Sequence, residues 1–571
     1  MSRKLLWLPI LLWVTAGYAQ DTSSASSSTS SSSLTPSASP TSSNPTATLD
    51  QATASGISTA GVHKFLGIPF ASPPINSLRF SAPVPVSSYN ATIDASHYGY
   101  SCPQQNVSLI SNYFHFRKRR SDFGQVKIDP TWMDVSLDDD DAPPENEDCL
   151  TVNVMRPDNA SESSNLPVVV WIVGGGFETG TTYASDADAV QLVTRSNELG
   201  HPLVYVSMNY RVSGWGFLAS QEVQSANATN LGLRDQRLAM QWTNRYIKSF
   251  GGDNTRVVIW GQSAGAISAS LHMLTNNGST DGLFRGAFMQ SGAPIPIGNY
   301  TEGQSVYDQI TNQTNCASSN DTLNCLRSVP FEDLKTVINR TPNYYSYSSL
   351  DLTWVPRADG IFLVDTPQRL VLQNSVARIP MVTGNVDDEG TVFALSSLNV
   401  TDSDEFKAFL DYAYLQHVPD PYVNEILNLY PNDSSAGSPF NTSNINAITP
   451  EYKRSAAFQG DVVFQAPRRF FVQQRSGYQP VWSYLSTRKK QTPFVGSYHG
   501  SDLANHILDD YLIYFVANLN PNTGNGPEWP QYDNNSKQIY SFINDGVGVT
   551  TDDYRVPQIS YLTNVSLEYP S

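Results

Sequence analysis

One stretch decides the fold of this chain: Val257-Val258-Ile259-Trp260-Gly261-Gln262-Ser263-Ala264-Gly265-Ala266. Its first four residues are β-branched or aromatic, which is typical of a buried parallel strand. The small-residue run over residues 264–270 can begin a helix. Between them lies the pattern Gly-x-Ser-x-Gly, so the sequence predicts a sharp strand-to-helix turn with Ser263 at its apex.

The glycines explain the spacing of this turn. Gly261 and Gly265 lack a Cβ, so a tight turn can close around Ser263 and lift its hydroxyl above the edge of the sheet. The backbone N–H of Ala264 then lies at a helix N-terminus, where unpaired amides and the helix dipole favour a negatively charged oxygen. A bare Gly-x-Ser-x-Gly also occurs in ordinary loops, but the flanking strand and helix favour a nucleophile elbow.

Length and charge limit the classes of protein that the chain can belong to. Its 571 residues are 40% hydrophobic, which is enough for a large core. The length fits either several domains or one long α/β unit. The net charge of -17 argues against a nucleic-acid partner, because phosphate binding needs clustered Lys and Arg.

The N-terminus has the pattern of a secretory signal. Arg3 and Lys4 precede an apolar run over residues 5–16, and Gly17-Tyr18-Ala19 is a small-x-small cleavage site. This pattern predicts a signal peptide over residues 1–19. The apolar run is shorter than the ~20 residues that a membrane-spanning helix needs. No later stretch qualifies, so we expect a secreted protein without a transmembrane segment.

A low-complexity segment follows the predicted signal. Residues 20–48 are nearly all Ser, Thr, Ala and Pro, which predicts a disordered linker. A single large domain is then expected over residues 49–571, and it begins with a stretch punctuated by prolines. Arg79 in this stretch and Glu147 either pair with each other or lie on a solvated surface.

The four cysteines fit two disulfides, as expected in a secreted chain, with three possible connectivities. Cys316 and Cys325 are near neighbours, so we expect them to close a small loop. By elimination, Cys102 pairs with Cys149 around a long loop. Many Asn-x-Ser/Thr sequons agree with secretion, namely Asn90, Asn106, Asn159, Asn227, Asn277, Asn299, Asn312, Asn320, Asn339, Asn399, Asn432, Asn441, Asn534 and Asn564.

The loop over residues 103–148 combines several aromatic residues with a basic run, Arg117 to Arg120, and an acidic run, Asp138 to Asp141. A long loop that is pinned by a disulfide, apolar on one side and charged on the other, is typical of a movable flap over an apolar site. The alternative is a surface insertion whose aromatic residues pack on the core. The basic run fits either a processing site or a solvated surface.

A second glycine run follows another predicted strand. Residues 166–173 are β-prone and lead into Gly174-Gly175-Gly176-Phe177. Three glycines let backbone N–H groups approach a ligand, so we expect Gly175 and Gly176 to form an oxyanion hole with Ala264. A phosphate loop is disfavoured, because neither Gly-x-Gly-x-x-Gly nor Gly-Lys-Ser/Thr is present. Strands alternate with helices around this region, which predicts a mainly parallel sheet covered on both faces.

Together these motifs resemble the type-B carboxylesterase/lipase family of α/β-hydrolases, which includes the cholinesterases and fungal secreted lipases. The resemblance implies an α/β-hydrolase fold, with a central, mostly parallel sheet flanked by helices, and an ester hydrolase without metal or cofactor. The motifs lie in order between residues near 60 and about 535. They are Glu147-Asp148-Cys149-Leu150, Gly174 to Phe177, Asn209-Tyr210-Arg211, Phe250 to Asp253, the elbow, and Gln290-Ser291-Gly292-Ala293.

The acid of the predicted site is chosen by resemblance. In α/β-hydrolases the chain order is Ser, then Asp or Glu, then His, each after a strand. Asp387, Asp388 and Glu389 follow a predicted strand over residues 379–383, and spacing alone does not choose among them. The family pattern Asp-Glu-Gly implies Glu389. By resemblance, Ser291 braces this acid.

Two of the eight histidines remain as candidates for the base. His499 lies in a loop after a predicted strand over residues 481–485, whereas His506 has helical surroundings. The family pattern His-Gly-x-Asp/Glu-Leu matches His499, and His506 is the remaining alternative. Ser263 would then be the nucleophile, His499 its general base, and Glu389 the group that holds the imidazole.

Two residues depart from the family pattern. Gln262 stands where the family usually has Glu, which removes a negative charge beside Ser263 and weakens the case for a cationic choline ester. Val173 stands where many esterases have His. The aromatic loop favours lipid or other apolar esters and a lipid–water interface, with a short-chain or cholinesterase-like enzyme as the alternative. A non-enzymatic adhesion protein is disfavoured, because such relatives lose members of the triad that this chain retains.

Overall fold

The structure is a computed structural model that describes residues 44–107, 114–118, 122–126 and 142–570. The predicted signal peptide lies outside these residues, as do most of the linker and most of the predicted flap. In the flap, the described part includes β6 (Phe114–Lys118), which pairs antiparallel with β7 (Asp122–Val126). The flap hypothesis therefore stays a prediction.

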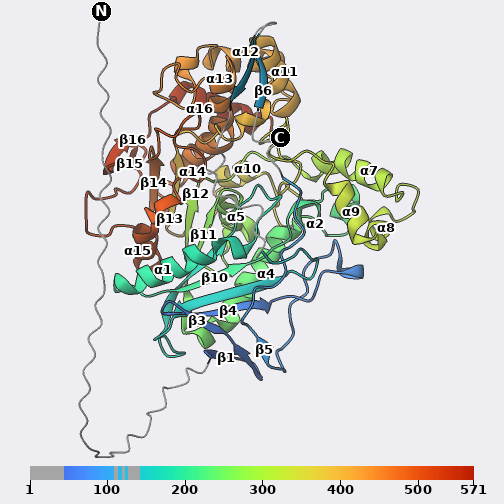
Figure 1. Cartoon of the computed structure of the whole chain (residues 1–571), viewed down its shortest axis with the longest axis vertical. Helices are drawn as coiled ribbons and strands as arrows, with labels where there is room; N and C mark the ends of the chain where they lie inside the picture. The colour runs from blue at the N-terminus through green and yellow to red at the C-terminus, as the bar shows by residue number, and fades with distance from the viewer. Residues whose placement is uncertain (1–43, 108–113, 119–121, 127–141, 571) are drawn as a thin grey trace, which may run out of the picture. The chain divides into compact units, whose positions relative to one another are not determined.

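An eleven-stranded sheet forms the centre of the described domain (Figure 1). The seven neighbouring strands from β10 to β15 pair in parallel, and the strands at both ends pair antiparallel. The mostly parallel sheet of the predicted fold is thus confirmed. In spatial order the strands are β16 (Gly546–Thr551), β15 (Gln538–Ile543), β14 (Val481–Ser486), β13 (Met381–Val386), β12 (Gly286–Gln290), β11 (Gly252–Gln262), β9 (Leu166–Ile172), β10 (Val204–Met208), β8 (Thr151–Pro157), β4 (Val62–Pro69) and β3 (Ile57–Thr59).

The central strands contain continuous apolar runs, such as residues 168–172 of β9 and 257–260 of β11, because both faces of the sheet are buried there. On β9, Val170 and Ile172 point into one core cluster, whereas Val169 and Trp171 point into the other. On β11, successive residues alternate between the two clusters in the same way. Side chains of a strand alternate between faces, so a sheet covered on both sides needs the continuous apolar runs seen in the sequence.

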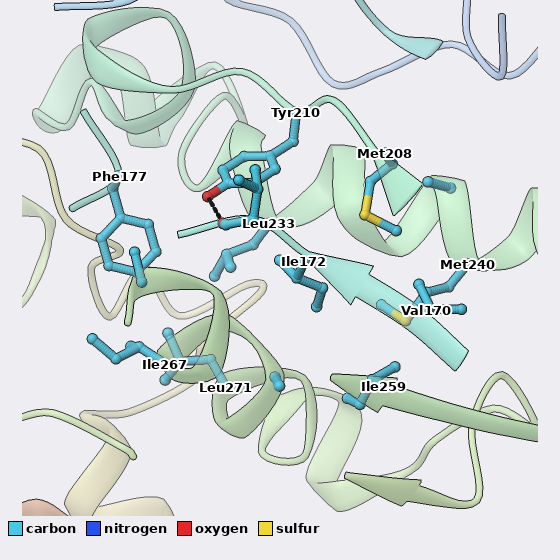
Figure 2. Close-up of a cluster of buried hydrophobic side chains, with 14 of the residues drawn as sticks. Val170, Ile172, Phe177, Met208, Tyr210, Leu233, Met240, Ile259, Ile267 and Leu271 are labelled. Atoms are coloured by element: carbon cyan, nitrogen blue, oxygen red, sulfur yellow. Dashed lines mark hydrogen bonds between the residues drawn. The ribbon is translucent and has the colours of Figure 1, made fainter. Parts of the chain in front are cut away.

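Helices cover both faces of the sheet. On one side, α1 (Asp186–Glu198) packs with α15 (Asp509–Asn518). On the other lie α4 (Leu231–Tyr246), α5 (Ala264–His272) and α14 (Ala466–Arg475). Figure 2 shows side chains of β9 between those of α4 and α5, with the Tyr210 hydroxyl donating to the Val173 carbonyl oxygen at 2.8 Å.

A further helical layer has its own apolar core. It consists of α11 (Ser403–Ala413), α12 (Asp420–Leu429), α13 (Tyr452–Gly460) and α16 (Val556–Glu568). A π-helical segment, η8 (Asp461–Gln465), joins α13 to α14. The smaller helices are α2 (Ser213–Phe217), α3 (Gln221–Ser225), α6 (Thr275–Gly278), α7 (Gln304–Gln313), α8 (Thr322–Ser328), α9 (Phe331–Ile338) and α10 (Pro367–Leu372).

A three-stranded sheet starts before the main sheet in the chain, and its first strand begins inside the predicted linker. It contains β1 (Thr46–Leu49), β2 (Ala52–Ser55) and β5 (Ile93–Asp94). The predicted end of the linker at residue 48 falls inside β1. Composition misled here, because Ala47 and Leu49 are buried alternately with exposed threonines and so form a strand from residues typical of a linker.

Other boundaries differ by a few residues. The elbow strand β11 begins at Gly252, five residues before the predicted run. The acid strand β13 begins at Met381 rather than at residue 379, because Pro380 lacks the N–H that a central strand donates. In the described residues, no helix combines the length and apolar character needed to cross a membrane.

Both predicted disulfides are present, Cys102–Cys149 and Cys316–Cys325. Of the two possibilities for Arg79 and Glu147, the structure shows the ion pair. Nε and one terminal nitrogen of Arg79 each lie 2.6 Å from a Glu147 oxygen, and both side chains are buried. Arg79 also donates to the carbonyl oxygens of Leu326, Arg327 and Val329, so the pair ties the segment before Cys149 to the chain beyond Cys325.

Replacing one partner of this pair is expected to destabilise the fold strongly. Glu147→Gln keeps the shape of the side chain but leaves the Arg79 charge buried without its counter-ion, which costs about 3–5 kcal/mol. Guanidinium unfolding followed by circular dichroism measures the loss. The matched control is Glu198→Gln, since Glu198 pairs with Arg195 but is 59% exposed. There the loss should not exceed about 1 kcal/mol, and equal losses in the two variants would contradict the assignment.

Candidate active site

The predicted elbow joins β11 to α5, and its backbone is strained. Ser263 has φ 56° and ψ -127°, a conformation that residues with a side chain rarely adopt. A Cβ on Gly265 would lie 2.0 Å from the Ile172 carbonyl oxygen, and one on Gly261 would lie 2.3 Å from the Gly265 carbonyl carbon. The turn therefore requires glycine at both positions, as the spacing predicts.

The three predicted oxyanion-hole residues line the same cavity as Ser263. Gly175 and Gly176 follow β9 with positive φ values of 105° and 65°, and Ala264 is the first residue of α5. In the described part of the chain, none of their three N–H groups donates a hydrogen bond to a backbone carbonyl outside the regular helices and strands. Such donors at a helix N-terminus and a glycine loop can bind an anionic oxygen.

Glu389 and His499 meet, although 110 residues separate them in the chain. Glu389 Oε2 lies 2.6 Å from His499 Nδ1. The other carboxylate oxygen, Oε1, accepts from Asn385 Nδ2 at 3.0 Å and from the Val386 N–H at 2.9 Å. Because a buried carboxylate accepts the hydrogen bond at Nδ1, the neutral imidazole carries its proton there and presents a lone pair at Nε2.

The other two carboxylates of the acid loop have different partners. Asp387 pairs with Lys490, and Arg555 lies 3.6 Å from it. Asp388 accepts from Lys490 at 2.7 Å and from the Ser497 N–H at 2.8 Å, so it joins the acid loop to the loop that carries His499. Their contacts remove the ambiguity that spacing leaves, since Glu389 is the member of the three that reaches the histidine.

The alternative histidine lies in a separate arrangement. His506 Nδ1 lies 3.0 Å from Asp509, and its Nε2 lies 3.8 Å from Asp188. Burial raises the pKa of Asp509 to about 6, despite the opposing effect of His506. His506 therefore contacts the carboxylates of α1 and α15 rather than the acid loop.

Sequence reasoning missed the residues that support the acid. Ser291, expected as the brace, donates its N–H to the Gly384 carbonyl oxygen, and its buried Oγ has no hydrogen-bond partner in the described residues. Asn385 and the Val386 N–H hold Glu389 instead. Asn385 lies near the end of β13, four residues before Glu389, and this proximity was the available signal.

Two aromatic rings lie close to the imidazole. The ring centroids of Phe393 and Phe464 lie 5.2 and 4.6 Å from that of His499. Phe464 belongs to the π-helical segment η8, and such segments are frequent at functional sites. The irregular turn thus places an apolar ring against the histidine.

These groups open onto one cavity of about 1050 Å³. Its wall is mostly apolar beyond the elbow, which suits an apolar ligand. Charged and polar side chains also line it, among them Asp188, Asp351, Arg357, Lys489 and Gln491, and burial raises the pKa of the Asp351 carboxyl to about 6. The apolar residues of the wall include Ile295, Ile297, Tyr345, Leu350, Leu352, Val355, Tyr414, Leu415, Val462, Val463, Leu562 and Val565.

In the part of the chain that the structure describes, no cluster of three or more His, Cys, Asp or Glu side chains is placed to hold a metal ion.

Comparison with known proteins gives a consistent result. A family model described as the carboxylesterase family matches residues 44–507. Lipase 2 of Diutina rugosa is 38% identical over 532 residues, which cover 89% of this chain and 94% of the relative. Secreted lipase 1 of Botryotinia fuckeliana is 36% identical over 534 residues, which cover 90% of this chain and 91% of the relative. The crystal structure of Aspergillus niger EstA matches with a TM-score of 0.77 and 26% identity, and covers 92% and 99% of the two chains.

Proposed function

The chain belongs to the carboxylesterase family and is a carboxylic ester hydrolase, and from that premise we propose that it works through a Ser263–His499–Glu389 triad and an acyl-enzyme. One observation carries the proposal. The carboxylate of Glu389 holds His499 Nδ1 at 2.6 Å, and the imidazole lines the same cavity as Ser263 and the three N–H groups. The other Glu389 oxygen is occupied by Asn385 and Val386, which fixes the orientation of the acid.

The proposed reaction has two halves. His499 Nε2 takes the proton of the Ser263 hydroxyl as Oγ attacks the ester carbon, and then returns it to the leaving alcohol. Water attacks the acyl-enzyme by the same route and releases the acid. Glu389 holds the tautomer and stabilises the imidazolium. The N–H groups of Gly175, Gly176 and Ala264 stabilise the oxyanion, each contributing about 3–4 kcal/mol.

We further propose lipid or other apolar esters as substrates, and secretion of the enzyme. The mostly apolar cavity supports the first, because it can bury a hydrocarbon chain beside Ser263. Several relatives are named lipases, and two are named secreted. The basic, apolar and small-residue pattern of residues 1–19 supports export.

Removing the proposed nucleophile is expected to abolish ester hydrolysis. Ser263→Ala should lower kcat on p-nitrophenyl esters by about 10⁶-fold, because the members of a triad act as a unit. The control is Ser270→Ala on the same helix, whose hydroxyl bonds to the Ile267 carbonyl oxygen. It should stay within about tenfold of the parent, since it leaves the transition-state contacts intact. Full activity in Ser263→Ala would end the proposal.

The choice of Glu389 among three carboxylates is tested by neutral isosteres. Glu389→Gln should lower kcat by about 10⁴-fold, because an amide at Nδ1 stabilises the wrong tautomer of His499. Asp387→Asn is the matched control and should lower kcat by less than about tenfold, since its partners are Lys490 and Arg555. Both assays are run where circular dichroism shows folded protein. A larger loss of kcat in Asp387→Asn than in Glu389→Gln would show that Glu389 is not the acid of the triad.

The cavity predicts a preference for long acyl chains. Along a series of p-nitrophenyl esters, kcat/KM should rise with chain length, because each buried CH₂ contributes about 0.8 kcal/mol. The rate on a triglyceride should also rise once the substrate passes its solubility limit. An optimum at acetate or butyrate with no rise on the emulsion would favour a short-chain carboxylesterase.

A further inference from the structure

The side chain of Gln262 contacts the proposed base. It is the last residue of β11, it is buried, and its Nε2 lies 3.2 Å from His499 Nε2. Glu389 already accepts the proton of Nδ1, so Nε2 presents a lone pair and the amide N–H donates to it. Both ring nitrogens of His499 are therefore occupied by protein groups.

Two glycines, Gly174 and Gly500, lie next to the Gln262 amide. A Cβ on Gly174 would lie 3.2 Å from Gln262 Oε1, and one on Gly500 would lie 3.8 Å from Gln262 Nε2. The glycine of the oxyanion loop and the glycine after the histidine thus border the amide. With Phe393 and Phe464 beside the imidazole, the packing limits how far the ring can turn.

This contact competes with catalysis. Nε2 has one lone pair, and in the described residues its hydrogen-bond partner is Gln262 rather than the Ser263 hydroxyl. A general base must accept the proton of the nucleophile through that same lone pair. The free enzyme consequently has to exchange an amide donor for a hydroxyl donor before the serine can attack.

We propose that Gln262 is a positioning residue that caps His499 Nε2 in the free enzyme and releases it to Ser263 when an ester binds. The inference rests on the proposed triad. A donor at Nε2 favours the neutral imidazole, which is the form that can act as a base. A carboxylate at this position would favour the imidazolium instead. Among the described residues, two other titratable groups act on the ring: Glu389 on the acid loop, which contacts Nδ1, and Asp502 on the loop of His499 itself, which interacts with the ring electrostatically.

The experiment compares the acidic limb of the kcat/KM profile in the parent, Gln262→Met and Gln262→Glu. Methionine keeps the length of the side chain but removes the donor, so the midpoint of the limb should move to higher pH. Glutamate places a negative charge beside the ring, and the midpoint should move further, by about 1 pH unit or more. Superimposable limbs in the three proteins, or a Met variant shifted to lower pH, would overturn the inference.

A second glutamine–histidine contact supplies the matched control. Gln236 Oε1 lies 2.9 Å from His272 Nε2, and both residues are buried outside the cavity. In this contact His272 Nε2 donates to the amide oxygen; Gln236→Met removes it at a site away from Ser263, so the acidic limb of Gln236→Met should coincide with that of the parent. A shift equal to that of Gln262→Met would show a general packing effect and count against the cap.

The contact between Gln262 and His499 can also be measured by NMR, without enzyme turnover. In protein labelled with ¹⁵N-histidine, the Nε2 resonance that is lost in His499→Asn should differ between the parent and Gln262→Met at a pH where the ring is neutral. An identical resonance in both would refute the cap. If Ser263→Ala stays fully active, the proposed function fails while this resonance still reports the contact. If Ser263→Ala is inactive and the resonances coincide, the cap alone fails.

Discussion

The strained turn at Ser263, with its positive φ, is the constraint on which the rest of the site depends. A backbone at φ 56° costs about 1–3 kcal/mol and persists where its surroundings over-determine it. Here the Ser263 N–H donates to the Gln290 carbonyl oxygen at 2.9 Å, and the Ile267 N–H donates back to the Ser263 carbonyl oxygen at 2.9 Å. A Cβ on Gly292 would lie 2.7 Å from the Ser263 carbonyl oxygen, so the turn also requires a glycine in the motif Gln290-Ser291-Gly292-Ala293. The strain is thus held by a strand on one side and a helix on the other.

Parallel pairing then brings the remaining groups to the same edge of the sheet. Ser263 follows β11, Glu389 follows β13, and His499 lies in the loop after β14. Parallel strands all end at one edge, and ligand sites form there in open α/β sheets. Asp388 strengthens the meeting of the last two loops, because it pairs with Lys490 and accepts the Ser497 N–H. A buried carboxylate next to the acid therefore acts on the position of the base.

The sequence predicts what depends on local pattern. Alternation of core faces on β9 and β11 follows from continuous apolar runs, and the glycine spacing of the elbow follows from sterics within five residues. The choice of Glu389 does not follow from local pattern. Asp387 and Asp388 form ion pairs with Lys490 and Arg555 instead of contacting His499, and these partners lie more than 100 residues away in the chain. Contacts between loops depend on register across the sheet, which no single segment encodes.

The site separates chemistry from substrate choice, and Gln262 lies where the two meet. The reacting groups project from strand ends, whereas much of the apolar wall comes from segments between the strands, including residues 344–357, 392–415 and 462–464. Such segments can vary without moving the elbow, because the sheet holds the elbow independently. Gln262 belongs to β11, yet its amide reaches the base from the cavity side. A ligand that enters the cavity therefore meets the amide at the same place where it must meet Ser263, so the proposed cap would couple occupation of the apolar wall to release of the proposed base.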